Sequence, residues 1–196
     1  MIKEELIYHS DSSIYFEKIK HLEWPVFLDS CYQKDKPQSK FARFDIITAN
    51  PFVKIRSNKG VTHVLDKDGD HQYKKSSLDI LDNLMAKYSK PSNNIPFVGG
   101  AIGYCSYELN LKTKKNNIID AMVMGIYDWA LIVDHLNKKS YMVSMMIDSQ
   151  TKFIWPDLIQ IFNKEIDSKF KEFKIKNTVR NNLSFQEYKN KFNKVM

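Results

Sequence analysis

The side chains that could do chemistry in this 196-residue chain do not form a known metal-binding or nucleophilic pattern. The acidic run 66–70 (DKDGD) has the composition of a calcium loop, but its glycine is the fourth residue rather than the sixth and no glutamate closes it, so it predicts a turn. The five histidines show no HxH or HExxH spacing, and neither cysteine has a neighbouring metal ligand. No serine lies in a GxSxG elbow. We therefore expect no metal site and no catalytic triad.

Two further features could carry chemistry. Asp128 lies between Tyr127 and Trp129 in a strand-like run, where a carboxylate could be a buried acid but more often accepts local hydrogen bonds. The glycines of GGAIG (99–103) lack the GxGxxG spacing, and a predicted strand rather than a helix follows them, which argues against a pyrophosphate site. They favour a bend in the strand or the close approach of another backbone.

Composition limits the class of protein. A hydrophobic fraction of 43% is enough for one sizeable core, and no apolar run reaches the ~20 residues that span a bilayer, so we expect a cytoplasmic protein without a membrane segment. The formal charge of +7 comes from lysines scattered among acids rather than from clustered arginines, which argues against nucleic-acid binding. Cys31 and Cys105 lack paired spacing and are expected to be free, buried thiols.

The elements that must position these side chains can be predicted from periodicity. Asp11 or Ser12 should cap a helix that continues to about Leu22, and the short β-branched and aromatic runs 25–30 and 43–49 predict strands. Residues 52–57 and 61–66 flank Asn58 and Gly60, which predicts a hairpin.

The second half of the chain continues this mixture. A helix is predicted at 78–88, long strands at 98–109, 121–135 and 140–148, and a helix at about 155–170 with Pro156 in its first turn. Helices mixed with hairpins indicate an α+β fold, with mainly antiparallel sheets and flanking helices, rather than a doubly wound parallel sheet.

The last segment predicts one more helix. Ser184 and Glu187 match a capping box, and Phe185, Tyr188, Phe192 and Val195 follow on one apolar face. This helix either docks on the same domain or is the start of a further domain in a longer protein.

Three stretches taken together resemble one enzyme family. They are HLEWPVFLDS (21–30), ARFDIITANP (42–51), and GGAIGYCSYEL with GIYDWALIVDH (99–109 and 125–135). In this order and spacing they resemble the amino-terminal half of component I of aminodeoxychorismate synthase, in the superfamily of anthranilate synthase component I. The resemblance implies a two-sheet α+β domain at 1–170, a connecting segment at 171–183, and at 184–196 the truncated start of a chorismate-binding catalytic domain.

The resemblance also implies a pocket for an aromatic amino acid of the tryptophan type. FLDS matches the family's LLES strand, so Leu28 would contact the indole and Ser30 would hydrogen-bond the polar end of the ligand. Phe41, Arg43, Phe44 and Asp45 match the second strand of that pocket. The alternative is that Leu28 and Phe44 are ordinary core residues. Asp29 departs from the family pattern, which has glutamate at this place.

The function implied by the resemblance is the synthesis of 4-amino-4-deoxychorismate from chorismate and ammonia, with magnesium in the full-length enzyme and a glutamine amidotransferase subunit (component II) as the source of ammonia. The catalytic segments of the family lie in its carboxy-terminal half, so this chain alone should hold no catalytic residues or cofactor. The alternatives are the same half of anthranilate synthase and a stand-alone module that only binds a ligand.

Overall fold

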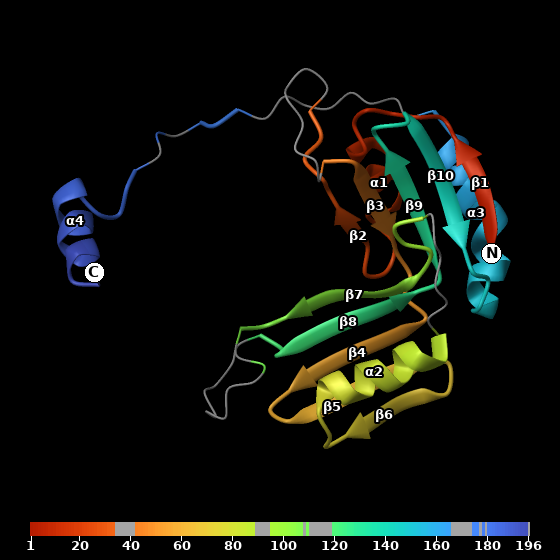
Figure 1. The fold of residues 1–196 in the computed structure, drawn as a ribbon, viewed down its shortest axis with the longest axis horizontal. Helices are drawn as coiled ribbons and strands as arrows, with labels where there is room; N and C mark the ends of the chain where they lie inside the picture. The colour runs from red at the N-terminus through yellow and green to blue at the C-terminus, as the bar shows by residue number, and fades with distance from the viewer. Residues whose placement is uncertain are drawn as a thin grey trace. The chain divides into compact units, whose positions relative to one another are not determined.

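The computed structural model describes residues 1–33, 42–88, 95–107, 109, 119–165, 174–176, 178 and 180–195. The chain divides into two compact units, residues 1–166 and 167–196. The larger unit contains two antiparallel sheets (Figure 1), and the smaller contains helix α4 (Phe185–Asn193). The finer division into a domain, a connecting segment and the start of a catalytic domain stays a prediction.

Each sheet has five strands in the described part of the chain, and all the pairs between them are antiparallel. The first sheet has the order β1 (Ile2–Leu6), β10 (Lys139–Ser144), β9 (Trp129–Asp134), β3 (Phe44–Thr48), β2 (Val26–Leu28). The second has the order β6 (Gly69–Tyr73), β5 (Val61–Asp66), β4 (Val53–Asn58), β8 (Met122–Tyr127), β7 (Gly100–Cys105). The predicted α+β class is confirmed.

Helices α1 (Ser13–Ile19) and α3 (Ser149–Asn163) cover one face of the first sheet (Figure 1). Tyr15 and Phe162 pack there on the fully buried Trp129 of β9. The prediction of a helix at 155–170 was wrong at both ends, because the helix begins at Ser149 and ends at Asn163. Asp148 accepts a hydrogen bond from the Thr151 backbone N–H at 2.9 Å, so it caps the helix several residues earlier and leaves Pro156 inside it.

Helix α2 (Ser77–Tyr88) covers one face of the second sheet, as its apolar spacing predicts, with Ile80 packed among residues of β4, β5 and β8. The hairpin of β4 and β5 is confirmed, but its positive φ angles are at Lys59 (50°) and Gly60 (80°) rather than at Asn58. The DKDGD turn is also confirmed, because it connects β5 to β6.

The long strand predicted at 121–135 is in fact two strands in two different sheets. The chain leaves the second sheet after Tyr127 and enters the first at Trp129, with Asp128 at the corner between them. Gly99, at a φ of 134°, packs on this corner: a Cβ atom there would lie 2.9 Å from the Tyr127 carbonyl oxygen. The predicted close approach of a second backbone at GGAIG is thus confirmed.

Helix α4 begins with the predicted capping box between Ser184 and Glu187. None of its described residues is buried, and Phe185 is 79% exposed. Across the described residues, no helix has the length and apolar character needed to cross a membrane. Both cysteines are free, as expected, but they are exposed rather than buried, since Cys31 follows the end of β2 and Cys105 ends the edge strand β7.

Candidate functional site

Asp45 on β3 is the centre of a buried hydrogen-bond network. Its Oδ1 accepts from the Ser30 backbone N–H (2.8 Å) and from Ser30 Oγ (2.6 Å). Its Oδ2 accepts from Ser12 Oγ (2.5 Å) and from His135 Nε2 (2.8 Å). Burial by itself would raise the pKa of Asp45, but the hydrogen bonds from Ser12, Ser30 and His135 outweigh it and hold the pKa below its ordinary value. Asp45 is therefore an ionised carboxylate surrounded by four donors.

His135 extends the network to a second group of residues. Its Nδ1 lies 3.1 Å from the Tyr8 hydroxyl, and the ring of Tyr32 stacks on the imidazole with centroids 4.2 Å apart and planes 3° from parallel. The imidazole is 2% exposed. These contacts connect Ser30 and Tyr32, which follow β2, with Ser12 before α1, Asp45 on β3 and His135 after β9.

Arg43 immediately precedes β3 and forms an ion pair with a neighbouring carboxylate. Its Nε and Nη2 donate to Asp134 Oδ1 and Oδ2 at 3.2 and 2.9 Å, and its guanidinium lies 4.3 Å from the centroid of the Phe44 ring. Burial would raise the pKa of Asp134, but the hydrogen bonds from Arg43 and Asn137 outweigh it and lower that pKa. The Arg43 side chain is 43% exposed, and its remaining N–H groups are not engaged by Asp134.

Leu28 ends β2 and faces the same side of the first sheet as its cross-strand neighbour Ile46. It is 46% exposed and thus not a core residue. Phe44 is partly buried, packed against a cluster that includes Ile132 and Val98. The two predicted apolar contacts therefore differ, with Leu28 open to solvent and Phe44 largely packed.

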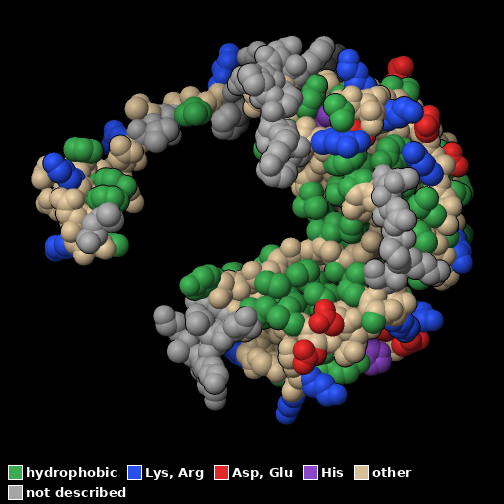
Figure 2. All heavy atoms as spheres, viewed as in Figure 1, with side chains coloured by type: hydrophobic (Ala, Val, Ile, Leu, Met, Phe, Trp, Pro, Cys, Tyr) green, Lys and Arg blue, Asp and Glu red, His purple; other side chains and the backbone are tan. Residues whose placement is uncertain are grey.

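An apolar cleft of about 130 Å³ lies between the edge of the first sheet and the face of β7 and β8 away from α2. Hydrophobic side chains line the hollow between the two sheets in Figure 2. Trp24, Val26, Ile102, Tyr104 and Tyr127 are among its lining residues. Such a slot suits an uncharged ring.

One wall of the cleft is held by a hydrogen bond. The Tyr127 hydroxyl donates to the Trp24 carbonyl oxygen at 2.9 Å, and burial raises the pKa of Tyr127 to about 12, so the hydroxyl stays protonated. Val26, at the cleft, and Ser30, in the polar network, are separated by at most about 13 Å of extended chain. Leu28 lies between them, so the apolar and polar features follow each other along β2 and the two residues after it.

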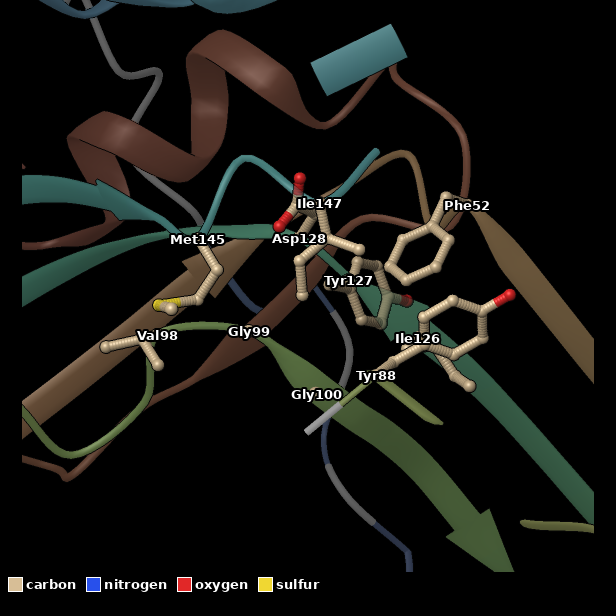
Figure 3. Close-up of a pocket in the computed structure, with 10 residues that line it drawn as sticks. All are labelled: Phe52, Tyr88, Val98, Gly99, Gly100, Ile126, Tyr127, Asp128, Met145 and Ile147. Carbon is tan, nitrogen blue, oxygen red and sulfur yellow. The ribbon is translucent and has the colours of Figure 1, made fainter. Parts of the chain in front are cut away.

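A second, much smaller cavity of about 10 Å³ lies at the corner formed by Asp128 (Figure 3). The rings of Phe52, Tyr88 and Tyr127 lie on one side of it, and the Asp128 carboxylate points away from them, beside Ile147. The backbone N–H of Asp148 donates to Asp128 Oδ2 at 2.9 Å. Asp128 thus accepts a hydrogen bond, but from a residue 20 positions away rather than from a local group as expected, and the cavity is too small for a substrate.

The predicted site residues fall into three groups. Ser30 and Asp45 are joined by hydrogen bonds, Arg43 and Phe44 lie against each other, and Leu28 is exposed on β2 opposite Ile46. Phe41 lies outside the described residues. Within the described ranges, no three His, Cys, Asp or Glu side chains are placed to hold a metal ion. The assignment of these residues to a ligand pocket stays a prediction.

Comparison with known proteins identifies the relatives of this chain. No protein-family model matches it. Aminodeoxychorismate synthase component 1 of Escherichia coli is 28% identical over 97% of this chain and 42% of its own length. Anthranilate synthase component 1 of Acetivibrio thermocellus is 30% identical over 53% of this chain and 23% of its own length.

The chain is related to component I of these two synthases. A solved structure of anthranilate synthase component I from Streptococcus pneumoniae has the same fold, with a TM-score of 0.50 and 23% identity over 66% of this chain and 31% of the other. Our chain spans about two fifths of the length of the aminodeoxychorismate synthase relatives.

Sequence reasoning missed several residues of the polar network around Asp45. It did not connect Ser12, Tyr8 or Tyr32 with Asp45, because they lie far apart in the sequence. Docking of α1 brings Ser12 to Asp45, and the pairing of β3 with β9 places His135, which Tyr8 and Tyr32 contact, beside that carboxylate. His135 was considered only as a metal ligand. Its place at the end of a buried strand, with Asp45 on the neighbouring strand, was the signal that could have revealed the pair.

We expect Asp128→Asn to stabilise the chain at neutral pH by roughly 1 kcal/mol. Burial raises the pKa of Asp128 above its ordinary 3.8, more than the backbone hydrogen bond from Asp148 lowers it. Below pH 3.8 the group is neutral in both states; as the pH rises, the unfolded chain ionises first and stability falls until the pH passes the folded pKa. Asparagine does not ionise. Urea unfolding at pH 3 and pH 7 measures the difference.

The matched control for this prediction is Asp157→Asn, which changes an exposed carboxylate on α3. It should leave the pH profile unchanged. A stabilisation by Asp128→Asn that is equal at both pH values would contradict the assigned cause.

Proposed function

We propose that this chain is the amino-terminal part of an aminodeoxychorismate synthase component I, where it forms a scaffold and holds an aromatic ligand of the tryptophan type. The observation that carries the proposal is the similarity to aminodeoxychorismate synthase component 1 along 97% of the chain. The anthranilate synthase relatives match shorter stretches, 53% of the chain in the Acetivibrio protein and 62% in the longest case.

The complete enzyme would convert chorismate and ammonia to 4-amino-4-deoxychorismate with magnesium, and a glutamine amidotransferase subunit would supply the ammonia. The chain by itself would not turn over chorismate. The cytoplasmic location and the absence of nucleic-acid binding stay predictions. Anthranilate synthase is the second candidate, favoured by the shared fold with the Streptococcus protein. A completed enzyme distinguishes the two by whether the amino group is at the 4- or the 2-position of the product.

The arrangement along β2 supports the ligand part of the proposal. The exposed Leu28 lies between an apolar cleft lined by aromatic side chains and a polar network that includes Ser30. An aromatic amino acid needs both kinds of surface, an apolar slot for its ring and polar partners for its charged end.

The test is calorimetric titration of the 196-residue chain with L-tryptophan. Leu28→Ala should weaken binding about tenfold, because roughly 1.5 kcal/mol of apolar contact is lost. Leu65→Ala is a matched control, since Leu65 is 45% exposed on β5, in the other sheet. No detectable binding by the unmodified chain, or equal weakening by both variants, would refute the ligand site.

A further inference from the structure

Strand β7 is a sheet edge that carries no charge. In the described part of the chain it pairs with β8 on one side, and no strand pairs with its other side. Its sequence, GAIGYC, has no charged residue, and neither has the described run 95–107 around it. Gly103, Tyr104 and Cys105 are exposed. An open edge that is apolar over six residues is a site for pairing with a further strand.

The other sheet edges have features that oppose such pairing. On β1, three charged residues follow one another, Lys3, Glu4 and Glu5. Strand β2 is three residues long, and β6 includes Asp70. Charged side chains and short strands are the usual protection of an edge. Among the edges that the structure describes, β7 is therefore the one without protection.

The backbone groups that face the open edge of β7 are those of Ala101, Gly103 and Cys105. The Ser106 N–H donates to the Ala121 carbonyl oxygen at 2.8 Å, which continues the pairing with β8. Along an antiparallel strand, the hydrogen-bonding groups of successive residues alternate between the two sides. The even-numbered residues of β7 therefore bond to β8, and the odd-numbered residues face outward.

These outward groups are complementary to a second copy of themselves. If two β7 strands pair in antiparallel fashion about a two-fold axis at Gly103, then Ala101 lies opposite Cys105 of the second copy. All three outward residues of each strand are then paired, and each pair exchanges two backbone hydrogen bonds. An axis at Ile102 or Tyr104 would leave one outward residue of each strand without a partner in the other β7. The axis at Gly103 is thus the register with the most hydrogen bonds.

The side chains suit the same register. Ile102 lies opposite Tyr104 of the second copy, on the cleft side of the sheet, and symmetry repeats this pair. An aromatic and a β-branched side chain form a favourable cross-strand pair. The charged residues that give each copy its formal +7 lie outside the described run 95–107, and salt screens the repulsion between exposed charges. No like charges therefore meet along the paired strands.

We propose that two copies of this chain associate through their β7 edges, which joins a five-stranded sheet of each copy into one continuous antiparallel sheet. The two-fold axis passes through Gly103, so that the same surface of each copy forms the interface, as in most symmetric dimers. The inference goes beyond the proposed ligand site and does not depend on it, because the backbone edge of β7 forms the interface.

Sedimentation velocity over a concentration series of the 196-residue chain tests the association, and a reversible dimer is expected. Tyr104→Lys should weaken the dimer about tenfold, because it removes the aromatic member of both cross-strand pairs and places a charge on the edge. Tyr73→Lys is the matched control. Tyr73 is 39% exposed on β6, the other edge of the same sheet, and Tyr104 is 45% exposed, so the control should leave the association unchanged.

Disulfide cross-linking tests the register in chains that also carry Cys31→Ser. Ala101→Cys should give covalent dimers with Cys105 of the second copy, since opposite hydrogen-bonded residues have Cα atoms about 5.5 Å apart, a distance that a disulfide spans. Within one chain these two positions are separated by about 13 Å of extended strand, too far for a bond. Ile102→Cys is the control, because its side chain is on the opposite face of the sheet from Cys105. Non-reducing gel electrophoresis measures both yields.

Three outcomes would overturn the inference. The first is a chain that stays monomeric at every concentration, which would leave the β7 edge to a strand of a different polypeptide. The second is a dimer that Tyr104→Lys and Tyr73→Lys weaken equally. The third is cross-linking through Ile102→Cys that is as efficient as through Ala101→Cys. Circular dichroism shows whether Tyr104→Lys folds, and if it does not, the two cysteine variants decide the question.

Discussion

Asp45→Ala should lower the free energy of unfolding by about 3–5 kcal/mol, the largest effect that we expect from a single polar substitution. The change removes the acceptor of four hydrogen bonds and leaves Ser12 and His135 as buried donors without that partner. Each such group costs roughly 1–3 kcal/mol. Urea unfolding followed by circular dichroism measures the loss.

The pH dependence of this effect follows from the lowered pKa of Asp45. The contribution of the carboxylate is fully present above its ordinary pKa of 3.8 and is lost as the pH falls through the lower pKa of the folded state. The difference between Asp45→Ala and the unmodified chain should therefore narrow in strong acid. Asp29→Ala is the control, since Asp29 is exposed and accepts one local hydrogen bond. Equal losses from the two variants would show that the network contributes little.

Gly103→Ala should have the second largest effect, at or above the upper end of the roughly 1–3 kcal/mol that overpacking costs. A Cβ atom at this position would lie 2.0 Å from the Val123 carbonyl oxygen and 2.8 Å from the Met124 Cα atom. Both are backbone atoms of β8, the strand with which β7 pairs, so β7 must separate from it. Hydrogen exchange of the β7 and β8 amides should increase in the variant.

The cleft provides a second measurement of the same change. Ile102 and Tyr104 on β7 form part of its lining, so separation of β7 should also weaken the binding of an indole ring. Gly60→Ala is the control, because no atom lies within 4 Å of the added methyl group and only the positive φ of the turn opposes it. The steric assignment would be wrong if Gly103→Ala exchanged its β7 amides no faster than the control.

The two substitutions with the largest expected effects, Asp45→Ala and Gly103→Ala, remove support from opposite ends of β2. Asp45 holds the chain just after this strand through Ser30, and Gly103 lies in the wall of the cleft that Val26 enters. A three-residue edge strand has few ladder hydrogen bonds of its own. Its position therefore depends on Asp45 of β3 and Tyr127 of β8, and on Ser12 before α1 and His135 after β9, which hold Asp45. Binding at the proposed ligand site, which includes β2, should therefore also depend on these side chains.

Local sequence signals were sufficient to predict many of the helices and strands. The apolar repeat at 78–88 predicted α2, and the capping box at Ser184 predicted the start of α4, because both signals act within a few residues. The order of motifs also indicated component I of the aminodeoxychorismate and anthranilate synthases, which the comparison with relatives confirmed.

The tertiary structure alone decided where the chain changes sheet and which polar groups meet. Strand periodicity is the same on both sides of Asp128, so it did not show that Met122–Tyr127 and Trp129–Asp134 belong to different sheets. Ser12, Ser30, Asp45 and His135 are ordinary residues in four separate segments, and a hydrogen bond between distant segments leaves no periodic trace in the sequence. The sequence by itself predicted many of the elements and the similarity to component I of these synthases. The pairing of β3 with β9 and the docking of α1 determined the polar centre of the candidate site.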